Sequence, residues 1–373
     1  MTSPPTNELY ESLTELERAR LGFVEEVRRA WATQVYPALR REFDATVPAP
    51  AAGSVTGALA HLRTLATYPW FAWLEREMQK LKWRQLLEMA QRHPDAVAAI
   101  DDPPGREEPG PGAEPPADLP SWYTSIDIHC QPGGLWWGDQ AAVVYELGAR
   151  ILHLGANSSH ELHRLFTARC FTDLPDGARI VDLGCGFGKS TVPFAERYPT
   201  AEVIGIDLSR PVLRLARHRA RQRGVGIAYL PGDASDVALP SHSCDVVTGT
   251  MLLHELPAPV LERTLHESAR LLKPGGQIRF LEFARTGDAF RDAVIVDHAI
   301  RNNEPFLPQL MELDVVGMLE RAGLTGARWT PFDERGDGPR PEGFPHRDEW
   351  HFPWAVLAAE RAGGPDRHDK EAA

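Results

Sequence analysis

The sequence has few cysteines and no long apolar run, and both absences narrow the class of protein. Its four cysteines, Cys130, Cys170, Cys185 and Cys244, include no close pair and no C-x-x-C motif. We therefore expect neither a disulfide framework nor structural zinc, and we favour a reducing, cytoplasmic setting. No segment approaches the ~20 apolar residues that span a bilayer, and the polar, acidic start predicts no secretory signal. No His, Cys and carboxylate cluster has metal-ligand spacing, which predicts that the protein needs no metal.

The sequence also has no excess of positively charged residues. The 373 residues carry a formal net charge of −12 at pH 7, with 43% hydrophobic and 25% charged residues. This balance is typical of a globular protein and argues against nucleic acid or an anionic membrane as the main partner. The one arginine-rich run, residues 210–223, holds six arginines at helical spacing. We expect it to be a solvated helix face.

The first part of the chain is predicted to be helical. Apolar positions recur at helical intervals from residue 8 to about residue 43, and Pro37 is expected to kink or end that helix. A second helical stretch runs from residue 57 to about residue 92, with an interruption near Tyr68-Pro69. Its aromatic side chains require a partner surface.

A composition change marks the predicted domain boundary. Residues 101–120 are dense in Pro, Gly and Glu, which predicts a mobile linker. We therefore predict two domains, a helical unit over residues 1–118 and a second domain over residues 119–373.

From residue 179 onward, strands and helices alternate in the predicted structure. The alternation predicts an α/β fold with a doubly wound, mostly parallel, seven-stranded sheet and helices on both faces. The expected strands are 180–183, 202–207, 227–230, 245–250, 277–282, 327–332 and 354–359. Two helices, 142–154 and 160–171, are expected before this region. Within it the expected helices are 190–198, 210–221, 259–272, 286–302 and 309–322. Lys273-Pro274-Gly275-Gly276 predicts a helix stop followed by a turn.

The stretch over residues 180–190 carries the strongest functional signal. An apolar run ends at Asp182 and breaks into alternating glycines before a helix start. Glycines let the backbone approach a ligand, and the free N–H groups of the helix start favour negative charge. A P-loop needs four residues between its first glycine and Gly-Lys-Ser, whereas three separate Gly184 from Gly188. The dinucleotide fingerprint needs its third glycine one residue later, where Lys189 stands.

What remains is Asp182-x-Gly184-x-Gly186-x-Gly188, which resembles the first motif of class I S-adenosylmethionine-dependent methyltransferases. The resemblance extends over about residues 175–285 through Gly232-Asp233-Ala234, Leu239-Pro240 and the run from Leu271 to Gly276. It implies a Rossmann-like methyltransferase domain over residues 119–373, with S-adenosylmethionine as its cofactor.

The resemblance also implies a set of cofactor-binding residues. Asp207, 23 residues after Gly184, would accept hydrogen bonds from both ribose hydroxyls, a role that would equally suit NAD. Asp233 and Ala234 would hold the adenine. Asp182 would steady the glycine turn or the methionine amino group, and Cys185 would contribute only its backbone. The full set is Asp182, Gly184, Cys185, Gly186, Asp207, Leu208, Asp233, Ala234 and Thr250.

Candidate residues for the methyl acceptor are fewer. A base is needed only where the acceptor must lose a proton. His254 titrates near neutrality and is the first candidate for base or orienting group. Glu255 is the second, and Glu282 and His298 are weaker candidates. Residues 122–142 mix aromatic, glycine and polar residues in the position where this family often carries a lid.

Within that lid, the resemblance makes His129, Trp136 and Trp137 candidates for substrate contacts. The alternative is that the tryptophans pack the two units together.

We predict methyl transfer from S-adenosylmethionine to an O or N atom of a small, partly apolar metabolite, by analogy in bacterial secondary metabolism. Two alternatives stay open. One is a non-catalytic S-adenosylmethionine-binding protein whose helical unit is a partner or dimerisation surface. The other is an NAD-dependent oxidoreductase. The N-terminal helices are also a candidate surface for a homodimer.

Overall fold

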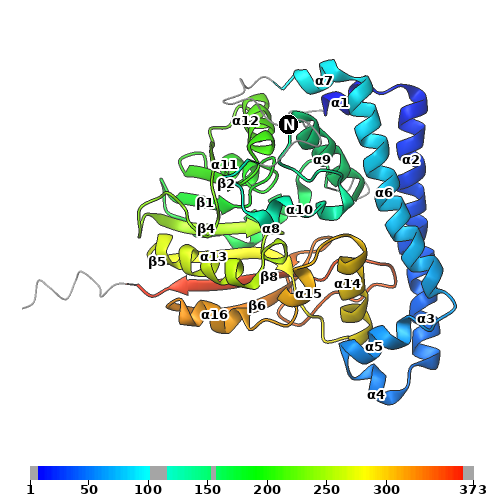
Figure 1. Cartoon of the computed structure of the whole chain (residues 1–373). Helices are drawn as coiled ribbons and strands as arrows, with labels where there is room; N and C mark the ends of the chain where they lie inside the picture. The colour runs from blue at the N-terminus through cyan, green and yellow to red at the C-terminus, as the bar shows by residue number, and fades with distance from the viewer. Residues whose placement is uncertain (1–6, 101–115, 153–156, 364–373) are drawn as a thin grey trace, which may run out of the picture.

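An eight-stranded sheet, covered by helices, forms the centre of the molecule (Figure 1). The computed structural model describes residues 7–100, 116–152 and 157–363. The strand order is β3-β2-β1-β4-β5-β8-β6-β7. The strands are β1 Arg179–Leu183, β2 Glu202–Asp207, β3 Ala228–Pro231, β4 Cys244–Thr250, β5 Leu272–Phe283, β6 Leu324–Asp333, β7 Gly338–Pro339 and β8 Trp354–Arg361.

The sheet confirms the predicted Rossmann-like fold and adds one strand. Strands β1 to β5 pair in parallel, and β8 lies antiparallel between β5 and β6. All seven expected strands are present. The eighth, β7, is a two-residue strand that pairs with the end of β6, and a Gly-Pro pair carries no strand pattern by which it could be predicted.

The predicted turn before the fifth strand lies inside β5. Helix α13, Ala258–Leu271, ends as expected, but β5 begins directly at Leu272. The register with β4 shifts there, since Cys244 pairs with Leu272 and Val246 pairs with Gln277. Residues 273–276 therefore form an irregularity in a continuous strand, which is where Pro and Gly are tolerated in a sheet.

Helices flank the sheet on both faces. Helix α12 begins at the cap residue Ser209, whose Oγ accepts from Val212 N at 3.2 Å, and ends before Gly224 at a φ of +68°. The segments of this domain are α8 Ser121–Thr124, η2 Ile128–Cys130, α9 Asp139–Leu152, α10 Glu161–Cys170, α11 Val192–Arg197, α12 Arg210–Arg223, η3 Leu253–Glu255, α13, α14 Ala289–Arg301, α15 Leu307–Leu310 and α16 Val315–Arg321.

The arginine-rich helix α12 is not simply a solvated face, which corrects the expectation from its charge. Arg214 and Arg219 are buried. Arg214 pairs with Asp139 of α9 at 2.6 Å. Arg219 pairs with Glu8 at 2.6 Å and with Glu146 at 2.7 Å. These carboxylates lie far away in sequence, so the charge pattern of α12 alone could not reveal them.

The first part of the chain is helical, as predicted, and forms a layer on one side of the sheet domain (Figure 1). In that view α2 and α6 are its two long helices. The elements are α1 Glu8–Ser12, α2 Glu15–Ala30, η1 Trp31–Val35, α3 Tyr36–Thr46, α4 Ala49–Ala52, α5 Val55–Leu62, α6 Tyr68–Arg92 and α7 Pro94–Ala98. None of the described helices combines the length and apolar character that crossing a membrane requires.

Pro37 does not end the first long helix. The backbone widens into a π-helical turn, Trp31–Val35, just before the proline, and Tyr36 N donates to Trp31 O. Pro37 then occupies the start of α3, which runs on to Thr46. Pro37 has no backbone N–H to donate within the helix. The π-helical turn before it accommodates this missing hydrogen bond, so the helix continues.

The helical layer shares one hydrophobic core with the sheet domain. Trp31 stacks on Phe71 with ring centroids 4.8 Å apart, and its Nε1 donates to Phe71 O at 2.9 Å. The Trp31 ring also meets Trp350 edge-on at 5.5 Å. Phe43 packs against Phe290 of α14 at 5.0 Å. The helices therefore pack on their own sheet domain. The division at residue 118 stays a prediction, and residues 101–115 of the expected linker lie outside the described residues.

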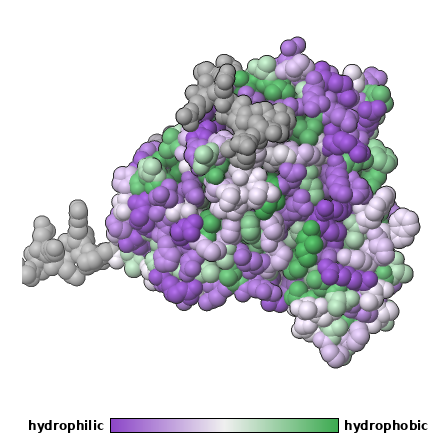
Figure 2. All heavy atoms as spheres, viewed as in Figure 1, coloured by the Kyte–Doolittle hydropathy of each residue, from purple (hydrophilic) through white to green (hydrophobic). Residues whose placement is uncertain are grey.

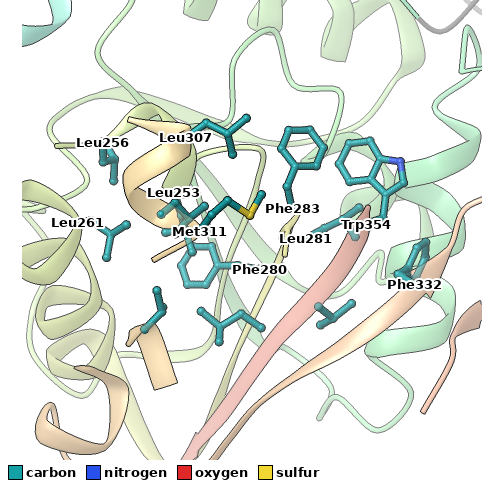
Figure 3. Close-up of a cluster of buried hydrophobic side chains, with 14 of the residues drawn as sticks. Leu253, Leu256, Leu261, Phe280, Leu281, Phe283, Leu307, Met311, Phe332 and Trp354 are labelled. Atoms are coloured by element: carbon teal, nitrogen blue, oxygen red, sulfur yellow. The ribbon is translucent and has the colours of Figure 1, made fainter. Parts of the chain in front are cut away.

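Below the carboxyl end of the central strands the core is dense (Figure 3). Phe280 of β5 lies beside Met311, and Phe283 lies near Leu307, in the same core as Leu281 and Trp354. Leu307 belongs to α15, and Met311 is the residue after it. Leu281 is fully buried, and replacing such a residue by alanine costs about 2–5 kcal/mol. This packing holds in place the backbone segments that carry the candidate site residues.

Candidate active site

The glycine turn after β1 leaves room for a ligand. Gly184 has a φ of +64°, and a Cβ there would lie 2.7 Å from Leu252 Cδ1. Gly186 has a φ of +52°, and a Cβ there would meet nothing within 4 Å. Both positions need the conformational freedom of glycine. The space beside Gly186 is open for a ligand that approaches the backbone closely.

Asp207 closes the other side of this turn. Its Oδ2 accepts from Gly186 N at 2.9 Å, and its Oδ1 accepts from Ser209 N at 2.8 Å. Burial raises the pKa of Asp207, against the opposing effect of these backbone donors. A carboxylate has about four lone-pair sites, so both oxygens can accept further hydrogen bonds from a ligand.

Asp182 lies beneath the turn and does not line the open space. Its Oδ2 accepts from Ser190 Oγ and Thr191 Oγ1, both at 2.6 Å. Burial raises the pKa of Asp182 to about 6, although these two hydroxyls act in the opposite direction. Of the two roles expected for Asp182, the geometry favours steadying the turn. Cys185 is buried with a raised pKa, which agrees with a contribution through its backbone.

Two hollows meet at the glycine turn. The first, which we name the Asp207 hollow, encloses about 970 Å³ including its open mouth. Of the expected cofactor residues it is lined by Gly184, Gly186, Asp207, Leu208, Asp233 and Ala234. Trp122 and Tyr123 of α8 also line it. Strands β1, β2 and β3 are neighbours in the sheet, which explains why their ends supply one continuous wall.

The second, which we name the His254 hollow, encloses about 1040 Å³ including its mouth. It is lined by Thr250 at the end of β4, by His254 and Glu255 after it, and by aromatic residues from β5, β8 and the loop before β8. The residues common to the two hollows are His129, Tyr145, Gly184, Gly186, Met251 and Glu255. His129 and Met251 have φ values of +53° and +56°, a strained backbone that is frequent at functional sites.

Glu255 stands between the two histidines that the sequence singled out. Its Oε1 lies 3.0 Å from His129 Nε2 and 3.3 Å from His254 Nε2. The other ring nitrogen of His254 lies 2.6 Å from Glu282 Oε1, and that of His129 lies 2.9 Å from Glu304 Oε1. Each imidazole is therefore placed between two carboxylates.

This alternation of acids and bases continues to the helical layer. His298 Nε2 lies 3.7 Å from Glu304 Oε1, and His298 Nδ1 lies 2.5 Å from Glu75 Oε1. Arg301 Nε donates to Glu75 Oε2 at 2.8 Å. Since Glu75 belongs to α6 and His298 to α14, the series joins the helical layer to β5 through buried charges. We name it the acid–base series, from Glu282 to Arg301.

The series fixes the charge of its members. Burial alone would lower the pKa of His254, but Glu282 and Glu255 outweigh it and hold the pKa well above its usual range. Burial would likewise lower the pKa of His129, but Glu255 and Glu304 raise it to about 9. Burial would raise the pKa of Glu255, yet His254 and His129 hold it far below its usual range. At neutral pH both imidazoles are therefore cationic and Glu255 is a carboxylate.

This charge state bears on the two roles expected for His254. Both of its ring nitrogens face carboxylates and carry protons, so the geometry favours the orienting role. In contrast, Glu255 Oε2 and Thr250 Oγ1 are buried without a hydrogen-bond partner among the described residues. Both residues line the His254 hollow. A ligand in that hollow is the available partner for them.

Several lining residues were not singled out from the sequence. Helix α6 contributes Gln79, Lys82 and Trp83, and α9 contributes Tyr145. Trp83 Nε1 donates to His129 O at 2.6 Å, so α6 also holds the segment that carries His129. The aromatic side of this helix required a partner, but nothing in its sequence identified the cavity.

Trp136 and Trp137 do not line either hollow. They are buried with Ala141 and pack against Leu87 of α6 and Tyr123. This arrangement corresponds to the alternative in which the tryptophans pack the two units together. In the part of the chain that the structure describes, no group of three or more His, Cys, Asp or Glu residues is arranged to hold a metal ion.

Comparison with known proteins agrees with this geometry. A family described as "Methyltransferase domain" matches residues 180–276. The nocamycin O-methyltransferase of Saccharothrix syringae is 40% identical over 119 residues, which are 30% of this chain and 41% of that protein. The demethylmenaquinone methyltransferase of Thermus thermophilus is 37% identical over 105 residues, 28% of this chain and 47% of that protein.

A third relative is the ubiquinone biosynthesis O-methyltransferase of Alkalilimnicola ehrlichii, 34% identical over 140 residues, 36% of this chain and 55% of that protein. The chain thus spans about half the length of the curated relatives it matches. Together, the sheet, the glycine turn and these matches show that the chain contains a class I S-adenosylmethionine-dependent methyltransferase domain.

The residues present fit the cofactor of that domain class, S-adenosylmethionine. The open space beside Gly186 admits close approach to the backbone. Asp207 and Asp233 line the same hollow, where their carboxylates can accept hydrogen bonds from sugar hydroxyls and a ring amine. The hollow is otherwise mostly apolar, as suits a purine.

Proposed function

We propose that this protein transfers a methyl group from S-adenosylmethionine to an oxygen or nitrogen atom of a small, partly apolar metabolite. The observation that carries the proposal is the junction of the two hollows at His129, Tyr145, Met251 and Glu255. A donor held in the Asp207 hollow and an acceptor held in the His254 hollow would meet at these residues. Alignment of two reactants in this manner is the main source of rate in such a displacement.

The cofactor, when bound, supplies a methyl group that is already activated by its sulfonium leaving group. The protein has to hold and orient both partners and keep water away. Asp207 and Asp233 bind the nucleoside. Glu255 Oε2 accepts a hydrogen bond from the acceptor O–H or N–H, while His129 and His254 hold the other oxygen. Because the pKa of Glu255 is held far below its usual range, this carboxylate orients the acceptor and does not keep its proton, which passes to solvent as the new bond forms.

A two-part experiment tests the proposal. S-adenosylhomocysteine is expected to raise the melting temperature of the full chain, and NAD is expected to leave it unchanged. Incubation of candidate aromatic hydroxy and amino compounds with S-adenosylmethionine should then give a product heavier by one CH₂ in mass spectrometry. A shift with NAD but not with S-adenosylhomocysteine would support the oxidoreductase alternative. Binding of S-adenosylhomocysteine without transfer across the panel would support the non-catalytic alternative.

The finer assignments are also proposals. A role in secondary metabolism is supported by the similarity to a protein named nocamycin O-methyltransferase. A cytoplasmic setting is supported by the absence of disulfides among the four cysteines.

Some exposed aromatic residues of the helical layer, Phe23, Trp70 and Trp73, support a homodimer surface. Hydrophilic residues cover much of the upper part of this layer (Figure 2). Sedimentation velocity would test the dimer.

A further inference from the structure

One face of α6 places polar groups in the His254 hollow that the proposed reaction does not use. Gln79, Lys82 and Trp83 all line this hollow. Their spacing of three and four residues puts them on the same helix face. Lys82 is only 3% exposed, and Gln79 is 7% exposed. Among residues 7–100, 116–152 and 157–363, no hydrogen bond or ion pair holds Lys82 Nζ, which lies 3.8 Å from the centre of the Trp83 ring.

The groups around Lys82 do not balance the positive charge of its ammonium form. Burial lowers the pKa of Lys82 well below its usual range, and the nearby Arg28 acts in the same direction. Cys130 and Glu304 act in the opposite direction but do not compensate. Glu304 Oε1 lies 2.9 Å from His129 Nδ1 and 3.7 Å from His298 Nε2. Glu304 Oε2 is buried without a hydrogen-bond partner among the described residues, and it makes no ion pair with Lys82. A buried amine without a counter-charge is destabilising unless a partner is supplied, and the hollow is the side from which a ligand can supply one.

We propose that Lys82 and Gln79 bind a carboxylate carried by an aromatic methyl acceptor, an inference that rests on the proposed methyl transfer. The ammonium of Lys82 provides the counter-charge, and the Gln79 amide adds a neutral donor one turn along the same face. The apolar part of the acceptor lies against Phe283, Phe352 and Trp354, which line the same hollow. Figure 3 shows two of these, Phe283 and Trp354, side by side above the core.

Binding of an anion should be linked to proton uptake. The pKa of Lys82 is lowered in the empty hollow, and a carboxylate placed beside its Nζ raises that pKa again. At a pH above the lowered pKa, formation of the ion pair therefore takes up a proton from the solvent. The uptake distinguishes a lysine that pairs with an anion from one that only packs against the ligand. It can be measured from the dependence of the binding enthalpy on the ionisation enthalpy of the buffer.

The test uses the full chain saturated with S-adenosylhomocysteine. Benzoate, 2-naphthoate and 3,4-dihydroxybenzoate are titrated calorimetrically, each beside its carboxamide, into wild type, Lys82→Met and Lys80→Met. Lys80 is the matched control, since it lies on the same helix with a side chain 47% exposed and paired with Glu77 at 3.1 Å. We expect at least one carboxylate to bind roughly tenfold or more tightly than its amide, with proton uptake, in wild type and Lys80→Met. Lys82→Met should lose both the preference and the uptake.

Two results would overturn the inference. One is that no carboxylate binds more tightly than its carboxamide, which includes the case in which neither compound binds. The other is a carboxylate preference that survives in Lys82→Met. Failure of S-adenosylhomocysteine to bind at the outset would instead count against the proposed function. Methionine is close in size to lysine and suits an apolar setting, so the variant should fold.

Discussion

Glu255 Oε1 lies 3.0 Å from His129 Nε2, and this contact ties the segment after β4 to the segment before α9. Both residues line both hollows. The contact therefore closes the junction where the two proposed reactants would meet. It also explains why the carboxylate stays ionised and the imidazole stays protonated, since each supplies the charge that the other lacks.

Replacing Glu255 by glutamine should reduce turnover more than cofactor affinity. The amide keeps the shape but cannot serve as a charged acceptor between two imidazolium groups. We expect a loss of roughly 10²-fold in kcat and a fall of about 3 kcal/mol in the free energy of unfolding, because two cations lose their shared partner. Steady-state kinetics and chemical denaturation would measure the two effects. A variant with wild-type kcat would exclude Glu255 from the reaction.

Replacing Asp207 by alanine should weaken binding of S-adenosylhomocysteine by roughly 10²-fold or more, since two hydrogen bonds to a charged group are worth about 1.5–3 kcal/mol each. Asp176→Ala, which removes an exposed carboxylate before β1, is the control and should bind normally. Isothermal titration calorimetry gives both values. Equal affinities would mean that the nucleoside lies elsewhere.

The stabilising contribution of His129 should depend on pH in a defined direction. Its pKa is raised in the folded state from its ordinary 6.5 to about 9. The folded state therefore holds this proton more tightly than the unfolded state, and the contribution is complete below pH 6.5 and lost as the pH rises through about 9. The difference in melting temperature between wild type and His129→Gln should be largest near pH 6 and should shrink toward pH 9.5. A constant difference would contradict the assignment.

Lys82→Met should stabilise the protein without ligand. The pKa of Lys82 is lowered in the folded state, so the unfolded state binds the extra proton, and wild type gains stability as the pH rises toward the ordinary lysine value of 10.5. We expect a gain of about 1–2 kcal/mol at pH 7 that diminishes at higher pH. Urea denaturation at several pH values measures it. Lys80→Met, on the exposed face, should show no such trend.

The sequence predicts the sheet domain well because its signals are local. The alternation of glycines after Asp182 determines a turn at the end of β1, Asp207 is the last residue of β2, and Asp233 lies two residues beyond β3. Since neighbouring parallel strands end at one edge, Asp207 and Asp233 were expected to line one space, and they do. Asp182 was grouped with them, but it lies below the turn because its partners, Ser190 and Thr191, belong to the turn that leads into α11.

The contribution of α6 could not be predicted in the same way. Four aromatic residues marked this helix as one that packs against a partner, but Phe71 and Trp83 are buried whereas Trp70 and Trp73 are 66% and 57% exposed. Periodicity alone does not separate them, since the buried side is determined by α9 and α14, which lie far away in sequence. For the same reason Glu75 and Glu304 gave no signal, although His298, between them, was a weak candidate.

The acid–base series has a consequence for how the protein can be shortened. A chain beginning at residue 119 would lack Glu75, so His298 and Arg301 would each lose one carboxylate partner and keep only Glu304 and Asp297, respectively. The apolar surface of α14 that the helical layer covers would also become exposed. Such a shortened protein is expected to be less stable and less soluble than the full chain and not to form a minimal enzyme. The helical layer is therefore part of the folded core, and a homologous domain that lacks it must cover α14 by some other means.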